Sequence, residues 1–208
     1  MNIEILCENN NNSNTYVVGD NEVIIIDPAN DERSIKKLVN DRKVLGIFLT
    51  HGHYDHFKRI RKLLKIYDTK VYMHKAAYLK LSDIYASCAV YFGCNEPVDI
   101  SKEQIVELKD GETIELGEMK IKVIFTPGHT NCSVCFKIEN EMFTGDTLFH
   151  EGVGRWDLPT ASSVQLSESI NKLLKSKTDY NVYPGHGESS TCFHEIKYNP
   201  YYEKNKRG

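Results

Sequence analysis

The sequence predicts an α+β fold in which two mixed β-sheets are flanked by helices. Two observations support this prediction. Short apolar or β-branched runs separated by turn residues occur in both halves of the 208-residue chain, and amphipathic segments lie between and after them. No repeat of fixed period and no linker-like stretch divides the sequence. We therefore expect a single domain over residues 1–208.

The chain begins with an expected antiparallel meander. Its strands are predicted at residues 3–6, 15–18 and 23–26, with a polar loop at residues 9–14. Residues 31–40 carry Ile35, Leu38 and Val39 at helical spacing, and residues 44–49 return to a strand. This order predicts a β-α-β passage after the meander.

Two helical regions and one short strand are expected next. An amphipathic helix begins immediately after His56 and carries Ile60, Leu63, Leu64 and Tyr67. After a strand at residues 71–73, residues 75–92 predict one or two helices with a hydrophobic, tyrosine-rich face. Four aromatic side chains are candidates for lining an acyl or thiol pocket, with core packing favoured for each: Tyr85, Tyr91, Phe92 and Tyr183.

The C-terminal half predicts a second sheet. Its strands are expected at residues 105–108, 113–116, 119–125, 133–138 and 141–144. A helix is predicted at residues 164–174 and a further strand at residues 180–183, and a terminal helix or tail closes the chain.

Composition and charge limit the binding partners and the cellular location that we expect for this protein. The net charge of −3 gives no reason to expect nucleic acid, and no apolar run approaches the roughly 20 residues that cross a bilayer. The N-terminus lacks a basic segment followed by an apolar run, so a cytoplasmic location and reduced cysteines are expected. Cys132 and Cys135 have redox spacing but begin a predicted strand, which favours structural cysteines. Whether the protein forms a homo-oligomer is left open by the sequence.

Seven side chains with metal-ligand chemistry follow predicted strands. Four of them lie within the six consecutive residues 51–56, and each of the other three is next to a glycine that permits a tight turn. Imidazole and carboxylate donors suit zinc, and also iron or manganese. Seven donors exceed what one tetrahedral ion uses, which indicates a site for two divalent ions. The candidates are His51, His53, Asp55, His56, His129, Asp146 and His186.

These residues, in this order, resemble the metallo-β-lactamase superfamily, whose mark is H-x-H-x-D-H followed by separate His, Asp and His. The resemblance covers most of the chain and implies a four-layer αββα sandwich. It also implies that Asp27 orients a ligand histidine and that Asp146 bridges the two metals. The implied first metal is bound by His51, His53 and His129, and the second by Asp55, His56 and His186.

Residues 145–149 and 152–159 further resemble the glyoxalase II branch, the hydroxyacylglutathione hydrolases. The chain ends about 20 residues after His186, so it looks like a short form without the C-terminal helical domain. This resemblance implies hydrolysis of a small hydroxyacyl thioester, such as S-lactoylglutathione, by a metal-bridging hydroxide. Asp55 would orient the nucleophile, and Arg155 would pair either with a substrate carboxylate or with Asp157.

Three other functions remain open. Sulfur dioxygenases of the same superfamily share the Gly-Arg-x-Asp element at residues 154–157, and their single iron would use His51, His129 and Asp146. A nucleic-acid-processing metallohydrolase would need the extra domain and basic surface that this sequence lacks. A non-enzymatic metal-binding module would need a closed coordination shell. Oxygen uptake with a persulfide, set against thioester hydrolysis, separates the first alternative from the favoured function.

Overall fold

Two β-sheets pack face to face at the centre of the computed structural model, which describes residues 1–7 and 13–202. Strands β1 to β6 lie side by side in chain order in the first sheet, and the second sheet has the order β12-β11-β10-β9-β8-β7. The first sheet comprises Ile3–Leu6, Thr15–Val18, Glu22–Ile26, Lys43–Phe48, Val71–His74 and Ile105–Leu108. The second, from β7 to β12, comprises Thr113–Leu116, Met119–Phe125, Val134–Ile138, Glu141–Gly145, Asn181–Pro184 and Ser190–Thr191.

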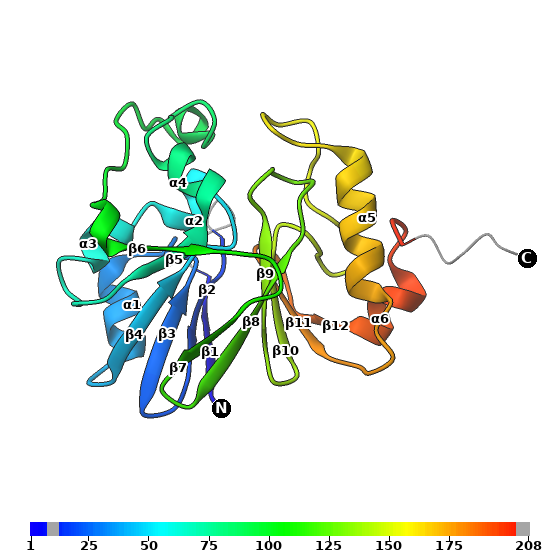
Figure 1. Ribbon diagram of the computed structural model, residues 1–208, viewed down its shortest axis with the longest axis horizontal. Coiled ribbons are helices and arrows are strands. Elements are labelled where there is room, and N and C mark those ends of the chain that lie inside the picture. The colour runs from blue at the N-terminus through cyan, green and yellow to red at the C-terminus, as the bar shows by residue number, and fades with distance from the viewer. Residues whose placement is uncertain (8–12, 203–208) are drawn as a thin grey trace, which may run out of the picture.

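Helices cover the outer face of each sheet, so the molecule has four layers (Figure 1). The first sheet is covered by α1 (Glu32–Val39), α2 (Tyr54–Phe57), α3 (Ile60–Leu63) and α4 (Lys75–Leu81). The second is covered by α5 (Ser163–Leu174) and α6 (Cys192–Tyr198). Two 3₁₀ helices, η1 (Ala89–Phe92) and η2 (Lys102–Gln104), lie between α4 and β6. The predicted α+β sandwich is confirmed.

The core between the sheets is aromatic and aliphatic. Phe48 stacks on Tyr72 with ring centroids 4.5 Å apart and meets Phe136 of the opposite sheet edge-on at 5.2 Å. Along β8, Ile121 and Val123 are buried whereas Lys120 and Lys122, on the opposite face of the strand, are exposed. Burial of this apolar surface supplies the main free energy that holds the sheets together.

The predicted meander and β-α-β passage are both confirmed. Strands β1, β2 and β3 pair antiparallel, and β4 pairs parallel with β3 after α1. Helix α1 begins where the Asp31 carboxylate accepts hydrogen bonds from the N–H groups of Arg33 and Ser34, a cap worth about 1 kcal/mol. Its buried side chains, Ile35 and Val39, pack on the sheet.

The prediction that residues 105–108 open the second sheet is wrong. Strand β6 pairs parallel with β5 and completes the first sheet, and the second sheet begins at β7. Side-chain polarity shows which face of a strand is buried but not which neighbour the backbone pairs with.

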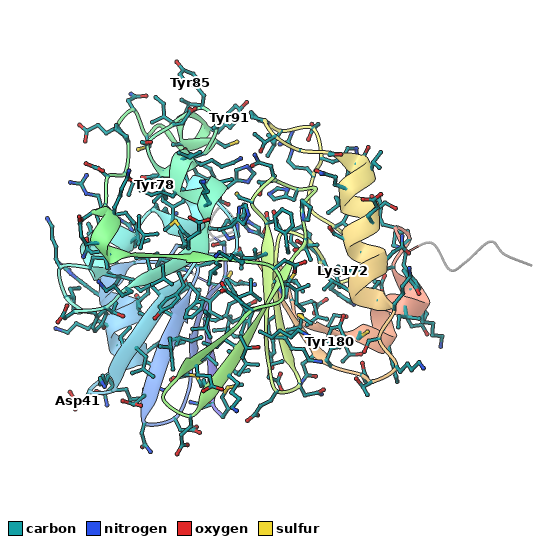
Figure 2. All side chains as sticks on the ribbon, viewed as in Figure 1. Asp41, Tyr78, Tyr85, Tyr91, Lys172 and Tyr180 are labelled. Atoms are coloured by element: carbon teal, nitrogen blue, oxygen red, sulfur yellow. The ribbon has the colours of Figure 1, made fainter. Side chains whose placement is uncertain are left out.

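The predicted helices near the metal-type motif also need correction. Helix α2 begins at Tyr54, inside the motif, and stops at Phe57 because the N–H of Arg59 bonds to the carbonyl of Pro28 instead of continuing the helix. Residues 75–92 form α4 and η1, separated by turns. Within this segment, Tyr85 and Tyr91 are 71% and 74% exposed and project from the surface, so neither packs in the core (Figure 2).

The C-terminal segment forms helix α6, as one of the two predicted possibilities required. The short strand β12, which precedes α6, was not predicted from the sequence. The loop predicted at residues 9–14 falls partly outside the described residues. In the described part of the chain, no helix combines the length and the apolar character needed to cross a membrane.

Candidate metal centre

The seven predicted ligands gather at one edge of the two sheets. Because β3 and β4 are parallel, and β10 and β11 are parallel, the residues that follow them converge at the same edge. All seven lie just after β4, β8, β10 or β11, or on α2: His51, His53, Asp55, His56, His129, Asp146 and His186. Residues up to 135 positions apart in the chain therefore share one site, from His51 to His186.

Three imidazole nitrogens form the first group of donors. Nδ1 of His53 lies 3.1 Å from Nε2 of His51 and 2.9 Å from Nε2 of His129. All three side chains are buried. Tetrahedral donors about 2.0–2.1 Å from a zinc ion lie about 3.3 Å from one another, so this spacing suits one ion.

The second group is more open to solvent. Nε2 of His186 lies 3.2 Å from Oδ2 of Asp55, whereas Nε2 of His56 lies 3.8 Å from the same oxygen. His186 is 30% exposed and Asp55 13%, compared with 0% for His56. The Phe149 ring meets His186 edge-on at 6.2 Å. The centre is therefore more accessible to solvent on the His186 side.

Asp146 lies between the two groups. Its Oδ1 is 3.3 Å from Nε2 of His56, and its Oδ2 is 3.4 Å from Nε2 of His129 and 3.7 Å from Nε2 of His186. One carboxylate thus faces imidazoles of both groups. This is the geometry that a bridging ligand requires.

Contacts on the outer side of the imidazoles set their tautomers. Asp27 accepts hydrogen bonds from the hydroxyl of Thr50 at 2.6 Å and from Nδ1 of His56 at 2.8 Å. Because the Thr50 hydroxyl donates to Asp27, its oxygen is left to accept from Nδ1 of His51, 3.1 Å away. The carbonyl of Arg155 accepts from Nδ1 of His129 at 2.8 Å. Each of the three rings therefore presents the lone pair of Nε2 to the site.

The electrostatics separate the histidines into two kinds. Burial, reinforced by neighbouring imidazoles, holds the pKa of His51 well below its usual range and lowers that of His53 to about 3. Burial also acts against protonation of His56, but the nearby carboxylates, first Asp146 and then Asp27, outweigh it and raise its pKa well above the usual range. The second group of donors therefore attracts positive charge.

Three buried side-chain atoms of the centre have no hydrogen-bond partner among the described residues: Nε2 of His53, Nε2 of His56 and Oδ1 of Asp146. The last two lie 3.3 Å apart and face each other without forming a hydrogen bond. Burying such atoms unpaired costs about 1–3 kcal/mol each, and more for charged groups. A cation between Nε2 of His56 and Oδ1 of Asp146 would satisfy both. The residues present therefore fit divalent metal ions.

One predicted site residue does not join the cluster. The Arg155 side chain is 62% exposed and binds the Asp157 carboxylate through two hydrogen bonds of 2.7 and 2.8 Å. Only its backbone carbonyl contacts the centre, through His129. Of the pocket candidates, Tyr183 instead packs against Phe143 with ring centroids 5.1 Å apart.

Two residues near the centre, Lys80 and Thr50, were missed by the sequence analysis. Lys80 is buried, donates to the hydroxyl of Thr160 at 2.6 Å and lies against Gly52. Burial lowers its pKa. The sequence signal for the burial of Lys80 was its position three residues after Ala77, on the same buried face of α4. Thr50 carried no signal because a threonine at a strand end is common.

The two cysteines with redox spacing lie inside the fold. Cys132 and Cys135 are buried, and burial raises the pKa of both thiols, to about 11 for Cys135. They remain protonated at neutral pH, as the predicted structural role requires.

Comparison with known proteins identifies relatives over most of the chain. The family model described as the metallo-β-lactamase superfamily matches residues 9–186. An uncharacterized protein of Aquifex aeolicus is 37% identical over 90% of both chains. A probable polyketide biosynthesis zinc-dependent hydrolase, PksB of Bacillus subtilis, is 29% identical over 92% of this chain and 82% of its own. A hydroxyacylglutathione hydrolase of Francisella tularensis subsp. novicida is 35% identical over 78% of this chain and 58% of its own.

Solved structures show the same fold. BLEG-1, a B3 metallo-β-lactamase, superposes with a TM-score of 0.88 at 26% identity, covering 96% of this chain and 98% of its own. TTHA1623 in a di-iron-bound form gives 0.83 at 29% identity, with 95% and 99% covered. ETHE1 from Myxococcus xanthus gives 0.75 at 26% identity, with 96% and 84% covered. The chain belongs to the metallo-β-lactamase superfamily of metallohydrolases.

Proposed function

We propose that this protein is a thioesterase that hydrolyses a hydroxyacyl thioester, such as S-lactoylglutathione, at a centre of two divalent metal ions, with zinc as the first candidate. The observation that supports this most is the position of the buried Asp146 carboxylate, which faces His56 on one side and His129 on the other. A single-ion site would not need a carboxylate that serves two groups of donors.

The proposed ligands follow from the two groups of donors. The first ion would be bound by His51, His53 and His129, the second by Asp55, His56 and His186, with Asp146 shared between them. When bound, the two ions supply an acidified water molecule and a positive charge beside the acyl oxygen. Iron and manganese also suit this donor set. The likeness to a di-iron-bound structure and to a zinc-dependent hydrolase supports a metal pair without selecting the element.

The protein residues would orient the reactants. Asp55, on the solvent-accessible side of the centre, would accept a hydrogen bond from the attacking water and direct its lone pair at the thioester carbonyl. Asp27 would act indirectly, by keeping the inward lone pair of His56 in place. The leaving thiolate, with a pKa of about 8.5, departs without a strong general acid. Arg155 would exchange Asp157 for a substrate carboxylate.

The thioester class is supported by the Francisella hydroxyacylglutathione hydrolase, of which this chain spans 58%. Glutathione is the thiol carrier that this similarity favours, and other cellular thiols belong in the same substrate screen.

The deciding experiment compares the native protein with Asp146→Ala, both loaded with defined metal. We expect two ions per native chain, fewer than two in the variant, and a loss of S-lactoylglutathione hydrolysis of at least about 100-fold. Asp41→Asn, at an exposed turn, is the control. Circular dichroism verifies that each variant folds. If Asp146→Ala retains both the activity and two ions, the two-metal mechanism is wrong.

A persulfide dioxygenase is the second candidate, and the likeness to the ETHE1 structure supports it. A single iron would use His51, His129 and Asp146 and leave His186 without a metal to bind. Substitution His186→Ala therefore separates the two functions. Loss of thioester hydrolysis supports the thioesterase, whereas full oxygen uptake with glutathione persulfide in the same variant supports the dioxygenase.

A further inference from the structure

A second cluster of metal-type donors lies outside the centre described above. It joins His150 and Glu151, in the loop after β10, to His194 on α6. Nε2 of His194 is 3.1 Å from Nε2 of His150 and 2.9 Å from Oε1 of Glu151, and the remaining pair is 3.7 Å apart. Three donor atoms from two distant segments therefore face one point.

The spacing of these atoms suits a metal ion. Donors at tetrahedral positions about 2.0–2.1 Å from zinc lie about 3.3 Å apart, and the three observed distances, 2.9, 3.1 and 3.7 Å, bracket that value. Two imidazole nitrogens and one carboxylate oxygen are a common ligand set of zinc sites with one open position. Partial exposure of the two imidazoles, 32% and 33%, leaves that position to water.

A fourth residue prepares His150 for this role. Nδ1 of His150 donates to Oε1 of Glu188 at 2.7 Å, which directs the lone pair of Nε2 toward His194. A carboxylate behind a histidine in this way is the usual outer contact of a metal-binding imidazole. With Glu151 and Glu188, the cluster holds two carboxylates around two imidazoles, a charge balance that favours a divalent cation.

The backbone that carries the donors is held in place. The buried Glu195 carboxylate accepts from the N–H of Glu151 at 3.0 Å and from the side chain of Asn199 at 2.8 Å. Asn199 also donates to the carbonyl of Gly152 at 3.0 Å. Helix α6 and the loop after β10 are thereby tied together at residues next to the cluster. Preorganised donors lose little conformational entropy when an ion binds.

We propose that His150, Glu151 and His194 bind one additional zinc ion, which links α6 to the loop after β10. This site is independent of the proposed thioesterase centre and shares no ligand with it. Its ion would stabilise the C-terminal part of the molecule, because it adds a bond between two segments that unfolding separates.

The test measures zinc content after equilibration with a small excess of free Zn²⁺ in the native protein and in His194→Gln. We expect one zinc equivalent fewer per chain in the variant, and a rise in Tm with added Zn²⁺ that is larger in the native protein than in the variant, whose main centre still binds its metal. The difference between the two proteins is the readout, so the result does not depend on whether the main centre binds one ion or two. Equal zinc content in both proteins overturns the proposal.

Two further variants and one spectrum make the assignment specific. Glu151→Gln, which leaves both histidines in place, is expected to lose the same equivalent. His74→Asn retains a good helix cap at α4 and is the matched histidine control, with unchanged zinc content. In ¹⁵N spectra of the imidazoles, Zn²⁺ is expected to shift Nε2 of His150 and of His194. An equal loss of zinc in the His74 variant, or unshifted nitrogens, contradicts the site.

Discussion

Oδ2 of Asp27 lies 2.8 Å from Nδ1 of His56, although 29 positions separate the two residues in the chain. Both side chains are buried, at 1% and 0% exposure. The same carboxylate accepts from the backbone N–H and the hydroxyl of Thr50, the residue before His51. Asp27 thus sets the orientation of two histidines from different parts of the motif.

Substitution Asp27→Asn is expected to weaken metal binding by about 10–100-fold, the usual effect of removing an outer contact of a ligand histidine. The amide keeps the shape of the carboxylate but loses the negative charge that directs the His56 proton outward. Competition with a chromogenic chelator measures the affinity. Asp41→Asn, far from the centre at an exposed turn, is the control (Figure 2). Unchanged affinity in the Asp27 variant contradicts the orienting role.

Substitution Gly154→Ala is expected to destabilise the protein by about 1–3 kcal/mol and to reduce metal affinity. A Cβ atom there would overlap the backbone carbonyl of Asp146 and would lie 2.9 Å from Nδ1 of His129. Gly152→Ala, in the same loop, is the matched control because its Cβ would have no neighbour closer than 3.6 Å. Urea unfolding and metal titration provide the two measurements. Equal stability of the two variants would rule out this steric account.

Substitution Arg155→Gln is expected to raise KM about 10-fold for S-lactoylglutathione, which carries carboxylates, and to leave KM unchanged for a neutral thioester. Stability should change little because the pair with Asp157 is exposed to solvent. Steady-state kinetics on both substrates provides the test. Asp157→Asn breaks the pair but retains the guanidinium, so it controls for the loop conformation. Equal effects of Arg155→Gln on both substrates contradict carboxylate recognition.

Substitution Asp110→Asn is expected to reduce stability at neutral pH by about 1 kcal/mol or less. Partial burial favours protonation of Asp110, but the N–H of Phe125 and the ammonium of Lys172 outweigh it and lower its pKa. Because the folded-state pKa is the lower one, the stabilisation is present above the unfolded value of about 3.9 and disappears as the pH falls through the folded value.

The measurement for Asp110 is the difference in free energy of unfolding between native protein and variant from pH 7 to pH 3. We expect this difference to be constant near neutrality and to shrink below about pH 4. Asp99→Asn, at an exposed position, is the control. A difference that grows toward acid pH would contradict the assigned direction.

Much of the fold, and the set of metal-type side chains that share one site, could be predicted from the sequence. Strand positions follow from apolar alternation, and donors placed directly after strands must meet when the strands are parallel neighbours. His51 and Asp146 follow strands of different sheets, so strand pairing does not join them; the number of strand-end donors and the resemblance to the metallo-β-lactamase superfamily predict that they share one site. The local pair of Arg155 with Asp157, one of the two alternatives left open, also followed from sequence proximity.

The tertiary structure decided the rest. Strand β6 joined the first sheet because backbone pairing, which side-chain polarity does not specify, depends on which strand lies beside it. The lone pairs of His56 and His129 point inward because hydrogen-bond partners from other elements, Asp27 and the Arg155 carbonyl, take the opposite ring nitrogens. The sequence by itself determined which donors the centre contains, since that depends on residue type and strand position. Only the folded chain determined how each donor is oriented, since orientation depends on contacts between residues that are distant in sequence.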